Sequence, residues 1–157
     1  MDKFTGRVWV LGDDIDTDII IPTEYLALKT IDDMKQYGFS PLRPELAGQI
    51  QKGDIIVAGK NFGCGSSREQ APEIIKAMGV QCVIAKSFAR IFFRNSINNG
   101  LLLIEQPDLY DDMKEGDEIT VVMNEHVDYN GKEYSIASLP ENLMSIIQAG
   151  GLVKAMR

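Results

Sequence analysis

The chain has 157 residues, the length of one ordinary domain, since two halves of about 80 residues would each bury little core. Hydrophobic residues make up 45% and charged residues 25%, which is a globular composition. The net charge of −7 argues against a nucleic-acid partner, because phosphate binding needs clustered Lys and Arg. It does not exclude a small anionic ligand, because a few local cations and backbone N–H groups can override the net field.

The two cysteines, Cys64 and Cys82, indicate a reducing compartment rather than a disulfide framework. They are too few to hold a zinc ion or an iron–sulfur cluster alone. The N-terminus lacks an apolar signal core, and no apolar run approaches ~18 residues. The sequence therefore predicts a cytoplasmic protein with no membrane segment and no metal site of its own.

The first third of the chain predicts one strand followed by irregular structure. Residues 7–11 form a short β-rich run. Residues 13–18 then place four carboxylates within six positions. The stretch from 19 to about 38 is expected to be helical or irregular, and residues 40–53 look like a connector.

The middle of the chain alternates strands and helices. Apolar runs at 54–58, 82–85 and 101–104 predict strands that are buried on both faces. Periodic apolar positions predict helices over 67–78 and 89–97. This order favours parallel pairing with right-handed crossovers, as in α/β proteins.

The last part of the chain has a β-rich pattern. A strand is predicted at 118–122, and the dipeptide Asn130-Gly131 is a hairpin signal whose partner strand we place at 134–137. A short amphipathic helix is expected over 140–149. Together these elements predict one domain over 1–157, with a mixed sheet and flanking helices.

The densest candidate site is the glycine-rich segment 59–69, between a predicted buried strand and a helix. Ligands of α/β sheets gather at such carboxyl ends, and glycines let the backbone approach a ligand closely. The N–H groups at a helix start suit a carboxylate or phosphate. Ser66 and Ser67 add hydroxyl groups, and Arg68 adds a planar fork that fits a carboxylate.

The same residues can also be interpreted as a helix cap with no role in ligand binding. Ser66 and Glu69 have the spacing of a capping box, which needs no catalytic role. Pro72 would then remove a hydrogen bond inside the helix. The helix can instead begin near Pro72, which would leave Ser66 to Arg68 in an irregular exposed turn. The segment is neither a Walker A loop nor a dinucleotide fingerprint.

Three further groups of residues could carry chemistry or be structural. Cys64 is either a nucleophile near a helix start or a small residue that fills a tight turn, and we favour the second. The cluster at 13–18 either binds a cation, orients an arginine, or forms a solvated turn with local side-chain hydrogen bonds. His126, the only histidine, is expected on the surface of the hairpin.

Three segments, 12–22, 61–72 and 85–100, resemble in this order the small subunits of 3-isopropylmalate dehydratases, the swivel-domain branch of the aconitase superfamily. The motif Asn-Phe-Gly-Cys-Gly-Ser-Ser-Arg-Glu-Gln-Ala-Pro at 61–72 is the most specific, and residues 149–153 also look like the family's short form. The resemblance implies a swivelling β/β/α fold. It also implies a separate large subunit whose [4Fe-4S] cluster acts as a Lewis acid on a 2-hydroxy dicarboxylic acid. This chain would then carry no cofactor itself.

The resemblance also assigns roles within the candidate site. Ser66 would be the catalytic base, taking a proton from the carbon next to a carboxylate, with Gly65 in the turn that stabilises its oxyanion. Ser67 and Arg68 would hold a substrate carboxylate, and Asp18 would orient charged groups at the edge. Further along the chain, Arg90 and Arg94 either pair with acidic residues or face the large subunit.

A short loop is expected to distinguish substrates. In related small subunits the loop that reads the substrate's variable group follows the Ile-Ile-Pro segment, and here it is Tyr25, Leu26, Ala27 and Leu28. Homoaconitase-like loops carry an arginine there, whereas Ala27 and Leu28 suit an alkyl group, since a buried unpaired carboxylate is costly. The loop therefore favours isopropylmalate in leucine biosynthesis over homoaconitate or citrate. A 2,3-dimethylmalate dehydratase is an open alternative. Gln70, where many bacterial relatives have histidine, leaves the exact subfamily open but not the reaction type.

A non-enzymatic function is the remaining alternative. The glycine-serine turn could belong to an anion-binding or interaction module that works without a partner. Co-purification with a cluster-bearing chain would favour the enzyme subunit, and a stable lone ligand-binding protein would favour the module.

Overall fold

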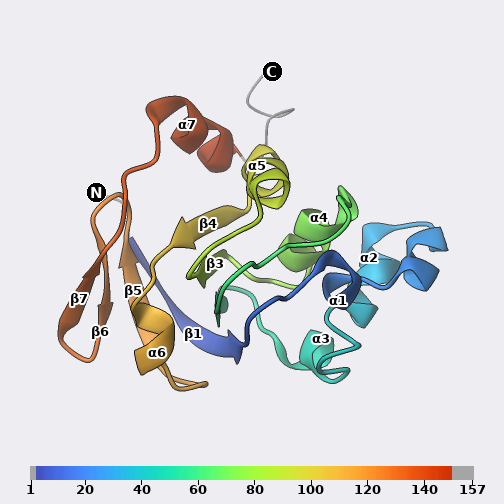
Figure 1. Ribbon diagram of the computed structural model, residues 1–157, viewed down its shortest axis with the longest axis horizontal. Helices are drawn as coiled ribbons and strands as arrows, with labels where there is room; N and C mark the ends of the chain where they lie inside the picture. The colour runs from blue at the N-terminus through green and yellow to red at the C-terminus, as the bar shows by residue number, and fades with distance from the viewer. Residues whose placement is uncertain (1–2, 150–157) are drawn as a thin grey trace.

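The computed structural model describes residues 3–149, through which a seven-stranded sheet runs in the order β4-β3-β2-β1-β5-β6-β7 (Figure 1). The strands are β1 (Lys3–Leu11), β2 (Ile55–Ala58), β3 (Cys82–Ala85), β4 (Leu102–Glu105), β5 (Glu118–Val122), β6 (His126–Tyr129) and β7 (Lys132–Ser135). The α-helices are α1 (Thr17–Ile20), α2 (Ile31–Met34), α3 (Leu46–Gln49), α4 (Gln70–Ala77), α5 (Arg90–Asn98), α6 (Leu109–Asp112) and α7 (Glu141–Ala149). Two 3-10 helices, η1 (Thr23–Ala27) and η2 (Lys35–Tyr37), complete the elements.

Strand β1 joins the two halves of the sheet because it changes partner along its length. Its first half, Lys3 to Arg7, pairs antiparallel with β5, and its second half, Val8 to Leu11, pairs parallel with β2. The parallel half continues through β3 and β4, and the antiparallel half through β6 and β7. The predicted mixed sheet with flanking helices is therefore confirmed.

The parallel strands are buried on both faces, as their apolar runs predict. Every residue of β2 and β3 is buried. Ile56 and Val83 face a core shared with α4 and the short N-terminal helices, whereas Ile55 and Ile84 face a core shared with α6 and the antiparallel strands. Figure 1 shows α1 to α4 gathered on one side of the molecule and the β6–β7 hairpin on the other.

The hairpin signal is also confirmed. Asn130 and Gly131 both have positive φ angles, 52° and 79°, which fits the two-residue turn between β6 and β7. The partner strand covers 132–135, two residues earlier than the predicted 134–137.

The capping-box interpretation of Ser66 and Glu69 is wrong. Helix α4 begins at Gln70, and its N-cap position, Glu69, makes no side-chain capping bond. Pro72 therefore lies in the first turn, where its missing N–H costs no helical hydrogen bond. The alternative, an irregular turn at Ser66 to Arg68 ahead of a later helix, is the one observed.

The remaining connections are short helices and turns. Residues 19–38 contain the end of α1 and the whole of η1, α2 and η2, and the predicted connector at 40–53 includes the single turn α3. Within residues 3–149 no helix is long and apolar enough to cross a membrane. The predicted family ending at 149–153 lies almost wholly outside the described residues.

Candidate active site

Two loops meet at the carboxyl ends of β1 and β2, the neighbouring strands at the centre of the sheet (Figure 1). Residues 12–18 follow β1, and residues 59–68 follow β2. The loops continue the pairing of the strands, since the N–H of Gly63 donates to the carbonyl of Ile15 at 2.7 Å. The acidic segment and the glycine-serine turn therefore lie side by side, although about 45 residues of sequence separate them.

The glycines of the turn are required by its geometry. Gly63 and Gly65 have φ angles of 84° and 89°, in the left-handed region that favours glycine. A Cβ atom on Gly63 would overlap the ring of Phe92 from α5. This close contact packs the turn against the start of α5.

All four acidic side chains of the 13–18 segment have protein partners. Asp13 accepts the N–H of Lys60 at 2.8 Å, and Asp14 accepts the side-chain amide of Asn61 at 3.0 Å. Asp16 caps α1 by accepting the N–H of Ile19. Asp18 forms an ion pair with Arg68. The cluster thus orients an arginine, which is one of the three predicted alternatives. Only Asp16 makes the local bond that the solvated-turn alternative requires, since Asp13 and Asp14 bond to the loop that follows β2.

Arg68 connects the turn to the segment that precedes the predicted specificity loop. Its guanidinium group donates to the carbonyl of Ile21 at 2.6 Å and to the hydroxyl of Thr23 at 2.8 Å, in addition to its ion pair with Asp18. Its side chain is only 12% exposed. The position of this cation is therefore fixed before any ligand binds.

The predicted specificity loop is anchored on the core. The ring of Tyr25 stacks on Tyr37 with centroids 4.0 Å apart, and Leu26 and Leu28 pack against the core beside α4. Ala27 is exposed. A small side chain therefore points outward from an otherwise fixed loop.

The serines lie at the exposed end of the turn. Ser66 and Ser67 are both exposed, and the side-chain amide of Asn95 on α5 donates to the Ser67 hydroxyl at 3.4 Å. Among residues 3–149, no protein oxygen accepts the N–H groups of Gly65, Ser66, Ser67 and Arg68. These successive N–H groups are therefore available to an anion, as in the backbone sites that bind phosphate or carboxylate.

A hollow of about 240 Å³ lies between this turn and the start of α5. Gly65, Ser67 and Arg68 line it together with Arg90 and Ile91. The structure thus brings three of the predicted site residues to one cavity. Its lining does not include Ser66, Asp18 or the loop from Tyr25 to Leu28.

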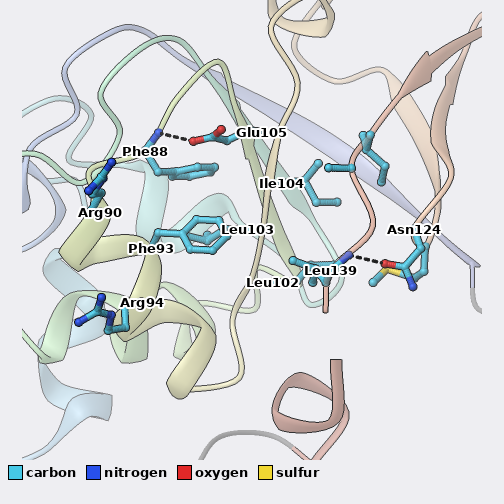
Figure 2. Close-up of a pocket in the computed structure, with 13 residues that line it drawn as sticks. Phe88, Arg90, Phe93, Arg94, Leu102, Leu103, Ile104, Glu105, Asn124 and Leu139 are labelled. Atoms are coloured by element: carbon cyan, nitrogen blue, oxygen red, sulfur yellow. Dashed lines mark hydrogen bonds between the residues drawn. The ribbon is translucent and has the colours of Figure 1, made fainter. Parts of the chain in front are cut away.

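A larger cavity of about 540 Å³ lies elsewhere, between α5, β4 and the segment after β7 (Figure 2). Its wall is mostly apolar, and it contains none of the residues predicted for the site. Figure 2 shows the guanidinium groups of Arg90 and Arg94 on the far side of Phe88 and Phe93 from the rest of this wall. Within the described chain neither arginine forms an ion pair, so the expectation that they pair with acidic residues is not met.

The two cysteines lack the surroundings of a nucleophile. Burial and the nearby carboxylates of Asp16 and Asp14 raise the pKa of the Cys64 thiol. Cys82 is fully buried in β3, and burial raises its pKa as well. The interpretation of Cys64 as a small residue in a tight turn is the one this environment supports.

The only histidine is on the hairpin, as predicted. His126 lies 3.1 Å from Asp128 and 3.3 Å from Glu133. In the part of the chain that the structure describes, these three side chains are the one group of metal-ligating type within reach of a single ion. They belong to the antiparallel half of the sheet and not to the serine turn.

Comparison with known proteins identifies the family. Residues 19–109 match the model of the aconitase C-terminal domain. The chain is 77% identical over 156 residues to a 3-isopropylmalate dehydratase small subunit of Lachnospira eligens, covering 99% of this chain and 95% of that protein. The chain belongs to the 3-isopropylmalate dehydratase small-subunit family. A small subunit 1 of Archaeoglobus fulgidus is 51% identical, covering 95% of this chain and 94% of that protein.

A solved structure supports the same assignment at the level of the fold. The crystal structure of 3-isopropylmalate dehydratase from Methanocaldococcus jannaschii superposes with a TM-score of 0.92 at 39% identity, covering 99% of this chain and 93% of that one. The predicted swivel-domain fold is therefore confirmed, and membership of a small-subunit family implies a large-subunit partner. Two residues that contact the turn, Thr17 and Asn95, were not singled out from the sequence, because their contacts with it depend on how the loop after β1 and helix α5 pack in the fold.

Proposed function

We propose that this chain, together with a large subunit, interconverts 2-isopropylmalate and 3-isopropylmalate by dehydration and rehydration in leucine biosynthesis. The observation that carries the proposal is the exposed Ser66 among backbone N–H groups that have no acceptor in the described chain. Such a group of donors stabilises an anion, which a serine must become before it can act as a base.

Ser66 is the proposed proton acceptor. Its alkoxide takes the proton from the carbon next to a substrate carboxylate, while the hydroxyl group leaves from the neighbouring carbon toward the partner subunit. Return of water with the opposite regiochemistry gives the isomer, and Ser66 then gives its proton back. A serine hydroxyl is a weak acid in water, so this role depends on the donors of the turn.

Ser67, Arg68 and Gly65 are the proposed carboxylate-binding group. Arg68 is held by Asp18, Ile21 and Thr23 through its two terminal nitrogens, and a guanidinium group has five N–H donors, so others are left for a substrate. The net charge of −7 does not oppose this binding, because the attraction acts locally at the turn.

The described residues do not fit an iron–sulfur cluster. Such clusters are held by several cysteine thiolates, and the whole chain has two cysteines, one of them buried in β3. We therefore assign the [4Fe-4S] cluster and its Lewis-acid chemistry to the large subunit.

The loop from Tyr25 to Leu28 supports isopropylmalate as the substrate. None of its four side chains is charged, and Ala27 is exposed with only a methyl group as its side chain. A third carboxylate placed there would lose water without gaining a cation from this loop. We therefore place the preference for an alkyl-substituted malate in this loop.

The test is Ser66→Ala in the two-chain enzyme, assayed with 3-isopropylmalate and, in parallel, with homoaconitate and 2,3-dimethylmalate. We expect wild type to prefer isopropylmalate and the variant to assemble normally. Because the base is lost, kcat should fall by about 10²–10⁴-fold.

The matched control is Ser138→Ala, an exposed serine outside the turn, which should leave turnover unchanged. Near-normal turnover by the assembled Ser66→Ala enzyme would remove the base assignment. If the wild-type enzyme instead turned over homoaconitate or 2,3-dimethylmalate faster than 3-isopropylmalate, the substrate would be reassigned and the proposed site would stand.

A further inference from the structure

Thr17 makes two hydrogen bonds to the glycine-serine turn. Its N–H donates to the carbonyl of Cys64 at 2.9 Å, and its hydroxyl donates to the carbonyl of Ser66 at 2.6 Å. Thr17 is only 2% exposed, so water does not compete for these bonds. One residue of the acidic loop therefore holds the turn on both sides of Gly65.

The bond to Ser66 determines the direction of a second group. The carbonyl of Ser66 and the N–H of Ser67 belong to one planar peptide unit, and no cis peptide bond occurs in the described chain. In a trans peptide these two groups point in opposite directions. Because the carbonyl points to Thr17, the N–H of Ser67 points away from it, and that N–H is one of the donors without a protein acceptor.

The hydroxyl of Thr17 is not needed for the local helix. Thr17 is the first residue of α1, but the side chain that caps this helix is Asp16, which accepts the N–H of Ile19 at 2.8 Å. The hydroxyl bond thus reaches across 49 residues of sequence to the turn. Its contribution is to the shape of the turn and not to the formation of α1.

We infer that Thr17 is a positioning residue for the reaction: its hydroxyl fixes the Ser66–Ser67 peptide so that the Ser66 side chain and the Ser67 N–H face the substrate together. This inference rests on the proposed function of the turn. A rotation of this peptide would withdraw the donor and shift the base, while the charge of Arg68 and its partner Asp18 would remain.

The experiment compares Thr17→Val with Thr17→Ser in the two-chain enzyme, with 3-isopropylmalate as substrate. Valine keeps the shape and removes the hydroxyl, whereas serine keeps the hydroxyl and removes a methyl group. We expect Thr17→Val to lower kcat roughly ten- to a hundredfold because the base is misplaced, with a smaller change in KM because Arg68 keeps its own partners and still binds the carboxylate. Thr17→Ser should retain most of the wild-type kcat.

The control variant is Thr120→Val, which removes a hydroxyl that bonds to Thr5 on the exposed face of the β1–β5 pair. It should leave kcat and KM unchanged. Thermal unfolding and assembly with the large subunit are measured for each variant, so that turnover is expressed per assembled enzyme.

The outcomes separate the inference from the proposed function. The positioning role is overturned if assembled Thr17→Val has the wild-type kcat, or if the valine and serine variants lose kcat equally. In either case an inactive Ser66→Ala enzyme would still support the proposed site. Near-normal turnover by Ser66→Ala would overturn both.

Discussion

At the scale of single residues, the site is defined by which polar groups already have partners. The carboxylates at 13–18 all have partners and Arg68 is held by three neighbours, whereas the backbone donors of the serine turn have no acceptor within residues 3–149. The sequence predicted that the turn is a candidate anion site, because glycine, serine and arginine occur there together. It could not indicate Thr17, because one threonine among aspartates has no signal until the fold places it beside Ser66.

The Cys64 thiol offers a test of the electrostatics beside the serines. Burial and the carboxylates of Asp16 and Asp14 disfavour the negatively charged thiolate, which raises the pKa of Cys64. The thiolate fraction at neutral pH is therefore below that of a free cysteine. We expect alkylation of Cys64 by iodoacetamide to be slow at pH 7 and to keep rising above pH ~8.5, the ordinary thiol value.

The measurement is the rate of mass gain of the folded chain between pH 6.5 and pH 10. Cys64→Ser serves as the control, because the buried Cys82 should not react in the folded protein. A rate that reaches its plateau below pH 8 would contradict the raised pKa.

At the scale of elements, apolar runs and turn residues predicted most of the sheet. The strands at 54–58, 82–85, 101–104 and 118–122 and the Asn130-Gly131 hairpin were located within two residues. The start of α4 was not settled, because a capping pattern is local while Pro72 imposes a competing constraint. The pairing of the 12–18 and 59–68 loops could not be predicted, since it depends on β1 and β2 being neighbours.

The contact between the turn and α5 predicts a large effect of Gly63→Ala. The new Cβ would overlap the ring of Phe92, and alanine would be forced to a φ of 84°. We expect the free energy of unfolding to fall by about 2–4 kcal/mol in a urea titration. The matched variant Gly116→Ala has a φ of 94° but no atom within 4 Å of the new Cβ, so it should cost about 1 kcal/mol. Equal losses in both variants would mean that packing on Phe92 contributes nothing.

At the scale of the whole molecule, the proposed function makes the chain one half of a two-chain reaction site. Ile91, at 61% exposure, lies at the edge of the hollow that Ser67 and Arg68 line, and Arg90 beside it has no ion-pair partner in the described chain. Arginine is enriched at protein interfaces, so we choose this edge of the hollow as the place to test for contact with the large subunit. The sequence could not show the other half, since that half belongs to another chain. The assignment of all 157 residues to one domain stays a prediction.

We expect Ile91→Asp to weaken association with the large subunit about tenfold or more, because a buried apolar contact would be replaced by a charge. The measurement is the turnover rate at a fixed concentration of large subunit and increasing concentrations of small subunit. Leu42→Asp, an equally simple change at a side chain 43% exposed but outside the hollow, should leave the curve unchanged. An unchanged curve for Ile91→Asp would place the interface elsewhere.

The double pairing of β1 also affects the order in which the protein can fold. One half of β1 pairs with β2, about 47 positions later, but the other half waits for β5, whose Thr120 is 115 residues beyond Thr5. During synthesis the parallel unit β2-β3-β4 is complete before β5 has been made. The N-terminal half of β1 therefore remains an open sheet edge until late, and closing it is a long-range step that slows folding.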